Sequence, residues 1–146
     1  MKLCYKNIGL LLFGLFLIAC NTKKYSRESI PAQRIEFGYM NQKTGGTNTY
    51  ILADNGQLFQ KSTITSRYTE YKKVKLKDAQ FIYSMVDQLK QSNSSMYTIG
   101  QETHFIRLRN GIELQEWKWD AADLNLPSDI KRLDELLIEI FEKKID

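Results

Sequence analysis

Between residues 35 and 76, alternating apolar and polar positions predict four β-strands. The first strand shows the pattern most clearly, because large apolar residues stand at every second position: Ile35, Phe37 and Tyr39. Turn signals then divide the chain, and the strongest is Asn55-Gly56, a dipeptide typical of tight hairpins. Even spacing places Tyr68 and Val74 on one face of the fourth strand. The other three strands are predicted over residues 48–53, 57–65 and 68–76.

In two later segments the apolar spacing changes to three and four residues, which predicts helices. The apolar stripe of residues 77–92 is formed by Ala79, Ile82, Val86 and Leu89. A second helix begins at Pro127 or Ser128, two residue types that favour a helix start. Its stripe is formed by Ile130, Leu133, Leu137, Ile140 and Phe141. Each stripe covers one side of its helix, so we expect both helices to pack on a sheet.

A hairpin is predicted between the two helices, from strands over residues 102–108 and 112–119. A three-residue loop, Arg109-Asn110-Gly111, would place Leu108 opposite Ile112, whereas a two-residue loop would separate this apolar pair. We therefore expect the three-residue loop. The complete order, ββββαββα, predicts an α+β domain with an antiparallel sheet of about six strands and both helices on one face.

The first 20 residues follow a different pattern. Lys2 and Lys6 precede twelve consecutive residues that are apolar or glycine, from Ile8 to Ala19. A helix that spans a bilayer needs about 20 apolar residues, whereas a secretory signal needs roughly 7–15. The run therefore predicts a cleaved signal peptide over residues 1–19, and a short uncleaved anchor is the alternative.

The apolar run ends in Leu17-Ile18-Ala19-Cys20, which resembles the lipobox of bacterial lipoproteins. In that family the cysteine is acylated and the chain is cut just before it, so the resemblance implies that Cys20 becomes a lipid-modified N-terminus. Each buried methylene of an acyl chain contributes about 0.8 kcal/mol, and two or more chains hold a protein firmly on a bilayer. The alternative is an ordinary secretory signal in which the cysteine is a coincidence.

Removal of the signal would change the charge and the thiol content. The whole chain has 21 basic and 17 acidic side chains, a net charge of +4, and loss of Lys2 and Lys6 lowers it to +2. That charge is ordinary and gives no reason to expect a polyanionic partner. With Cys4 removed and Cys20 acylated, no thiol would remain for disulfides, catalysis or metal binding.

Residues 20–34 are polar and contain a proline, so we expect a lipidated N-terminus followed by a flexible tether. A single domain is expected over residues 35–146, because no repeat or second composition regime appears there. The tether's basic residues are either ordinary solvated charges or contacts to anionic lipid, and they are Lys23, Lys24, Arg27 and Arg34.

No acidic run follows Cys20. In Bacteroidota lipoproteins, such a run resembles a signal for export to the cell surface. If the chain comes from such an organism, its absence favours the periplasmic face of the outer membrane. Basic residues interleave with tyrosines between Arg67 and Lys77, but an exported lipid-anchored protein rarely meets nucleic acid, so we expect no nucleic-acid partner.

The sequence offers little catalytic chemistry. His104, the only histidine, stands at an alternating strand position and is interpreted as a structural residue. Glu135, Glu139 and Glu142 share a helix face, but Glu139 precedes Lys143 by four residues, which is typical of an exposed ion pair. We therefore expect a protein that is not an enzyme and has no catalytic residue, metal or cofactor.

Aromatic residues are the stronger functional signal. Trp117 and Trp119 share one face of the last predicted strand. We expect the helices to cover this face, because large aromatic residues mostly form cores. If the face is instead open, a docking site for a protein or glycan partner is predicted at Trp117, Trp119, Tyr68 and Tyr71.

The layout of residues 35–141, with an opening strand, the pair Gly45-Gly46, two hairpins and two helices, is similar to that of emfourin-type inhibitors of thermolysin-like metalloproteases. That resemblance implies protease inhibition and is carried to no particular residue. In its Lys-, Ile-, Asn- and Tyr-rich composition the chain also resembles small uncharacterised lipoproteins of Bacteroidota. We expect an envelope lipoprotein that acts as a protein-interaction or assembly module on an unknown envelope partner, with protease inhibition as the alternative.

Overall fold

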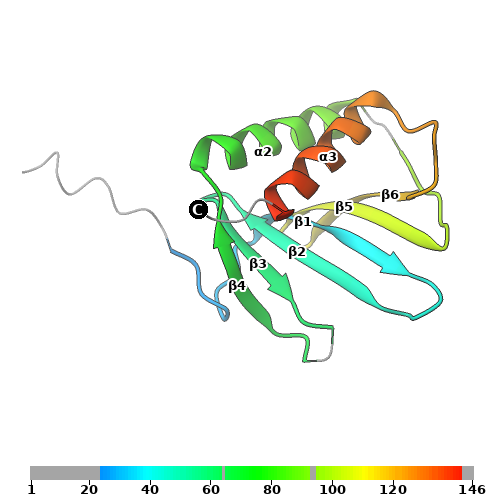
Figure 1. Ribbon diagram of the computed structural model, residues 1–146. Coiled ribbons are helices and arrows are strands. Elements are labelled where there is room, and N and C mark those ends of the chain that lie inside the picture. The colour runs from blue at the N-terminus through cyan, green and yellow to red at the C-terminus, as the bar shows by residue number, and fades with distance from the viewer. Residues whose placement is uncertain (1–23, 64, 93–94, 143–146) are drawn as a thin grey trace, which may run out of the picture.

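The computed structural model describes residues 24–63, 65–92 and 95–142. It has six strands in one antiparallel sheet and two helices, so the predicted α+β class and the order ββββαββα are confirmed. Both helices lie on the same side of the sheet, and the far ends of the first four strands extend beyond them (Figure 1). The elements are β1 (Gln33–Asn41), β2 (Thr47–Ala53), β3 (Gln57–Lys61), β4 (Tyr68–Lys73), α2 (Leu76–Gln91), β5 (Glu102–Asn110), β6 (Glu113–Asp120) and α3 (Ser128–Glu142).

Strand β1 lies inside the sheet, whose order is β4-β3-β2-β1-β5-β6. It pairs with β2 on one side and with β5 on the other, and both pairs are antiparallel. Gly38 in β1 has φ 153°, and a Cβ at this position would come within 1.9 Å of the Asn48 carbonyl oxygen. The close approach of β1 and β2 therefore requires glycine at position 38.

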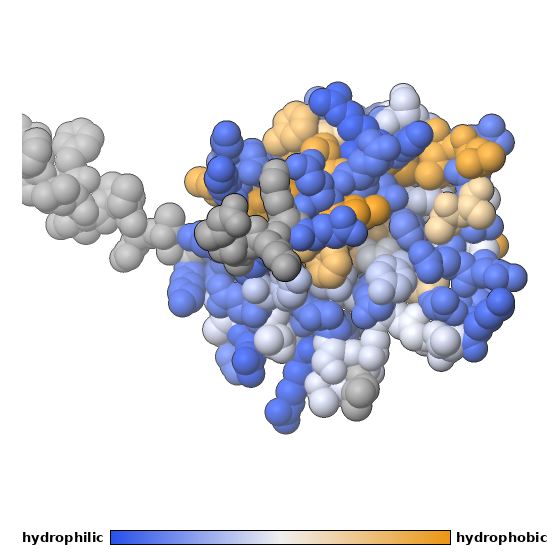
Figure 2. Space-filling model, viewed as in Figure 1, coloured by the Kyte–Doolittle hydropathy of each residue, from blue (hydrophilic) through white to orange (hydrophobic). Residues whose placement is uncertain are grey.

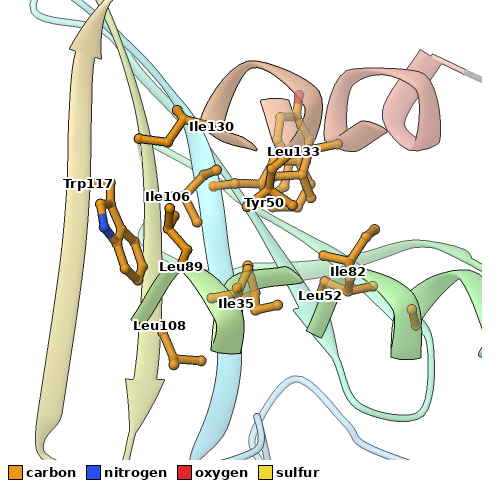
Figure 3. Close-up of a cluster of buried hydrophobic side chains, with 14 of the residues drawn as sticks. Ile35, Tyr50, Leu52, Ile82, Leu89, Ile106, Leu108, Trp117, Ile130 and Leu133 are labelled. Carbon is orange, nitrogen blue, oxygen red and sulfur yellow. The ribbon is translucent and has the colours of Figure 1, made fainter. Parts of the chain in front are cut away.

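The main core lies between the sheet and the two helices. Ile35 and Leu52 from the central strands are fully buried there, as the alternating pattern predicts. The hydroxyl group of Tyr83 on α2 donates to the carbonyl of Leu52 at 2.8 Å, which fastens that helix to the sheet. Figure 3 shows side chains from both helices and four strands meeting in this cluster, including Ile82, Leu89, Ile106, Leu108, Trp117, Ile130 and Leu133.

The predicted three-residue loop of the β5–β6 hairpin is wrong. Asn110 pairs with Glu113, so the loop holds only Gly111 and Ile112. Gly111 has φ 62°, the positive value that a type II′ turn needs at its first central position. Ile112 is 100% exposed. The shifted register turns Trp117 and Trp119 to the core, where they bury more apolar surface than Ile112 and Leu114 would.

A bulge interrupts the pairing of β3 with β4. Leu58 lies opposite Lys72 and Phe59 lies opposite Glu70, so Tyr71 is the extra residue. The bulge changes the face on which the β4 side chains lie. Tyr68 packs against a cluster on the helix-free face, whereas Val74 belongs to the helix-side core, so the prediction that they share a face is wrong.

We call the sheet face opposite the helices the rear face. A small second core lies on it, formed by Tyr25, Ile51, Ala53 and Phe59. Tyr25 is only 6% exposed, and its backbone N–H donates to Gln57 Oε1 at 2.7 Å. Gln57 Nε2 donates back to the Tyr25 carbonyl at 3.2 Å. Within the segment that we expected to be a flexible tether, Tyr25 and Ile30 are therefore packed on the sheet, whereas Lys24 and residues 26–29 are exposed.

Candidate functional site

The predicted lipidation site, Cys20, lies outside the described residues, and so does the whole predicted signal peptide. Among the residues that the structure describes, no helix is long and apolar enough to cross a membrane. Within those same residues, no group of three or more acidic, histidine or cysteine side chains is arranged to hold a metal ion.

The four aromatic residues predicted as a possible docking site do not come together. Trp117 and Trp119 are 0% and 1% exposed and lie beneath the helices, so they belong to the core and not to a docking surface. Tyr68 is half-buried on the rear face. Tyr71 alone is exposed on the helix-bearing face, where its ring contacts Tyr50 and Phe141.

Tyr71 belongs to an aromatic cluster that we call the tyrosine patch: Tyr39, Tyr50, Tyr71 and Phe141. The Tyr50 ring forms its floor, with its centroid 4.4 Å from that of Phe141 and 6.2 Å from that of Tyr71. Burial, followed by the nearby hydroxyl groups of Tyr39 and Tyr71, raises the pKa of Tyr50. Tyr39 and Tyr71 remain 37% and 46% exposed. The patch therefore offers one accessible tyrosine ring, Tyr71, on a packed aromatic base, and a second, Tyr39, which lies near Tyr50 and contacts His104.

The end of α3 is fixed against this patch. Lys72 Nζ donates to the carbonyl of Phe141 at 3.0 Å, which satisfies a backbone acceptor in the last turn of the helix. Burial lowers the pKa of Lys72. The bulge places Tyr71 and Lys72 together at this point, so both contact Phe141. On the side of the molecule seen in Figure 2, hydrophilic residues lie between the hydrophobic residues that reach the surface, so the hydrophobic residues form several small areas.

His104 lies next to the patch and links β5 to α3. Its Nδ1 atom is 3.1 Å from Asp134 Oδ2, and its Nε2 atom is 3.3 Å from Glu102 Oε1. The hydrogen bond to Asp134 is the main cause of a raised pKa for His104, and burial opposes it. With an acidic side chain at each ring nitrogen, the imidazole is held in place and favours the protonated form. This geometry agrees with the structural interpretation of His104.

The rear face carries a network of charged side chains around a buried carboxylate. Glu36 Oε1 accepts from Arg34 Nε and from Arg109 Nε, each at 2.9 Å. Arg107 Nη1 is 4.0 Å from Glu36 Oε2, and Arg107 Nε donates to Glu116. We call this cluster the rear network: Arg34, Glu36, Arg107, Arg109, Glu116 and Lys118. As described, it holds four cations and two carboxylates, an excess of two positive charges.

Two cations of the rear network stabilise the ionised form of Glu116. Burial opposes the ionisation of Glu116, but hydrogen bonds from Lys118 and Arg107 outweigh it, so the pKa of Glu116 is lowered. The Lys118 Nζ atom lies 2.8 Å from Glu116 Oε2. Arg107 also lies over the Phe105 ring, with Cζ 4.3 Å from the ring centroid, so a cation–π contact helps to hold the guanidinium in place.

A hollow of about 310 Å³ opens beside the rear network, and we call it the rear hollow. Two cationic side chains, Lys61 and Arg107, line it. The rest of the lining is Gly45 and five residues that carry a hydroxyl group: Thr47, Thr49, Ser62, Thr63 and Ser66. None of the described residues around it is acidic. Cations and hydroxyl groups together suit an oxyanion.

Sequence reasoning found Tyr71 but missed Tyr39, Phe141 and the rear hollow. The face on which Tyr71 lies depends on the bulge, which the alternation of the strand does not reveal. Phe141 was assigned to the core stripe of its helix, but its ring is only half-buried. The hollow needs residues from β2, β3 and β5, whose neighbourhood follows only from the sheet order.

No match to the chain was found among protein-family models, curated proteins or solved structures. The similarity in layout to emfourin-type inhibitors therefore remains a resemblance in the order of elements. The lipobox-like sequence and the two surfaces described above are the features that bear on function.

Proposed function

We propose that this chain is a lipid-anchored protein of the bacterial cell envelope whose domain binds a protein partner through the tyrosine patch. The observation that carries the proposal is the exposure of Tyr71 on a base made by Tyr50 and Phe141, with the exposed ring of Tyr39 nearby. Tyrosine is enriched where proteins bind one another, because its ring buries a large area and loses little conformational freedom. A rigid base reduces the ordering that a partner would otherwise have to impose.

A non-enzymatic role fits the way in which the reactive side chains are used. His104 is held at both ring nitrogens by acidic residues of its own domain. Glu36 and Glu116 are held by basic side chains within the rear network. These groups support the fold, whereas the tyrosine patch faces outward. The geometry therefore favours a binding function over a catalytic one.

The anchoring part of the proposal rests on the lipobox-like sequence. It is tested by replacing the sulfur atom of Cys20 with oxygen in Cys20→Ser. In a bacterium that acylates lipoproteins, the wild-type chain should incorporate labelled palmitate and sediment with outer membranes. Cys20→Ser should abolish both, because the acylated sulfur would be absent. Label in the Cys20→Ser protein, or a natural protein whose mass includes Met1, would contradict the proposal.

The binding part is tested by capture with matched tyrosine variants. The wild-type chain, Tyr39→Ala/Tyr71→Ala and Tyr97→Ala are crosslinked in native envelope, purified and compared by mass spectrometry. Tyr97 is the control, because it is 66% exposed but lies beside Lys118 and away from the patch. We expect a partner that is retained with wild type and Tyr97→Ala and reduced at least tenfold with the double variant.

The identity of the captured protein decides between the two roles considered. Components of an envelope complex support an assembly module. A metalloprotease whose activity falls when the chain is added supports the inhibitor alternative. Equal capture by the double variant and wild type would exclude the tyrosine patch as the binding surface.

A further inference from the structure

We infer that the rear face of the sheet docks on the membrane that carries the lipid anchor, with the oxyanion of an anionic phospholipid headgroup in the rear hollow. The inference deepens the proposed function and rests on its anchoring part. It follows from three independent features: the place where the anchoring segment joins the domain, the distribution of charge between the two sides, and the lining of the hollow.

The anchoring segment joins the domain on the rear face. Tyr25 is buried there between the ends of β2 and β3 and is held by two hydrogen bonds to Gln57. Only five residue steps separate Tyr25 from Cys20. A fully extended chain of that length spans at most about 18 Å, so acyl chains on Cys20 would keep the rear face close to the bilayer.

The two sides of the domain differ in charge. The rear network has an excess of two cations, Lys61 adds a positive charge beside it, and Glu70, which accepts from Gln57 on the same face, removes one. On the other side, α3 carries five acidic and two basic residues, and α2 carries two of each. An anionic leaflet attracts clusters of basic residues and repels acidic ones. The charges therefore favour the orientation in which the rear face meets the lipid.

The rear hollow has the chemistry of a headgroup site. Lys61 lies directly opposite Thr49 in the β2–β3 register, so a cation and a buried hydroxyl group stand side by side. Among the described residues Lys61 makes no ion pair, and Arg107, whose Nε atom is paired with Glu116, supplies a second cation. A volume of about 310 Å³ is roughly ten times the 30 Å³ that one water molecule occupies, which is room for a phosphate group and its ester substituents.

The test uses the natural acylated protein bound to vesicles, with amide hydrogen exchange read by mass spectrometry. Vesicles of phosphatidylglycerol and of phosphatidylcholine are compared. In the anionic vesicles we expect exchange to slow at least threefold in the rim of the hollow, residues 42–47 and 65–67, and to stay unchanged in the first turn of α3. The slowing should disappear at high salt, because exposed charges are then screened.

Two lysine variants separate docking from a general effect of charge. Lys61→Gln should remove most of the slowing, whereas Lys77→Gln, which takes the same charge from an exposed position on α2, should leave it intact. Equal exchange in both kinds of vesicle, or equal effects of the two variants, would overturn the inference.

Inorganic phosphate added to the neutral vesicles tests the other source of the same oxyanion. If phosphate alone slows exchange at the rim as strongly as phosphatidylglycerol does, the hollow binds a soluble oxyanion and membrane docking is wrong. Absence of labelled palmitate from the wild-type protein would show separately that the chain is not lipid-anchored. That result would contradict both the anchoring part of the proposed function and the docking of the rear face. If the protein is acylated but amide exchange in the rim of the hollow does not slow, only the docking of the rear face is wrong.

Discussion

His104 makes the stability of the domain depend on pH. Its two ring nitrogens face Asp134 and Glu102, and its ring lies 6.3 Å from that of Tyr39 and 6.0 Å from that of Trp119. The hydrogen bond to Asp134 is the first cause of its raised pKa, against an ordinary value of 6.5. The folded protein therefore retains this proton at a higher pH than the unfolded chain does.

The sign of the effect follows from the raised pKa. Stabilisation by His104 is fully present below about pH 6.5 and is lost as the pH rises through the folded pKa. We predict that urea unfolding of wild type and His104→Gln will differ more at about pH 5.5 than at about pH 8.5. A difference that is independent of pH would show that the two carboxylates do not retain the proton.

Glu36 is the residue of the rear network whose loss should destabilise the domain most. Its side chain is buried and accepts from Arg34 and Arg109, so Glu36→Gln would leave neighbouring guanidinium groups without a counter-charge. Breaking a buried ion pair costs about 3–5 kcal/mol, and we expect a smaller loss, about 2–3 kcal/mol, because both arginines are partly exposed to solvent.

The measurement for Glu36→Gln is the free energy of unfolding in urea. Glu113→Gln is the matched control, because Glu113 is exposed at the start of β6 and should change stability by less than about 0.5 kcal/mol. Similar values for the two variants would mean that the network around Glu36 contributes little to the fold.

Periodicity predicted the helices and strands well, because each of them buries one regular face. The stripe of α2 is buried as the sequence indicated, at Ala79, Ile82, Val86 and Leu89. Strand register was harder to predict, because two apolar sets compete for the core in β6. The chosen register buries Trp117 and Trp119 and exposes Leu114, and only the summed packing of the sheet and helices decides between them.

The observed hairpin register can be tested at its tip. Ile112 is fully exposed in the two-residue loop, so Ile112→Ser should change the free energy of unfolding by less than about 0.5 kcal/mol. In the three-residue alternative Ile112 would face Leu108 in the core. Ile106→Ala is the reference for a buried position in the same hairpin and should cost about 2–5 kcal/mol. A loss of similar size for Ile112→Ser would favour the alternative register.

The candidate surfaces were predictable only in part. The lipobox-like segment is local in the sequence, so Cys20 could be proposed without any structure. The sequence analysis named Tyr71. Its neighbours in the tyrosine patch, Tyr39 and Phe141, come from β1 and α3, which lie far from β4 in the sequence. The rear hollow likewise combines side chains that are up to 62 positions apart, from Gly45 to Arg107. Such surfaces are set by strand order and by irregular pairing, which a single sequence encodes weakly.

The two proposals together assign one side of the domain to the membrane and the other to a partner, and in this arrangement Tyr25 is the contact that would orient the domain. If Tyr25 holds the anchoring segment on the rear face, Tyr25→Ala should release that segment without unfolding the sheet. Burial of the ring is worth about 2 kcal/mol, which corresponds to roughly a 30-fold change in the population of the detached segment.

Limited trypsin digestion measures this detachment, because cleavage after Arg27 requires an extended chain that leaves the sheet. We expect Tyr25→Ala to accelerate that cleavage roughly 30-fold, in line with the loss of ring burial, and Tyr97→Ala to leave it unchanged. In vesicles, the same variant should reduce the protection of the rim of the hollow, because a longer tether lets the domain turn away from the lipid. Rapid cleavage after Arg27 in the wild type would mean that the segment does not orient the domain.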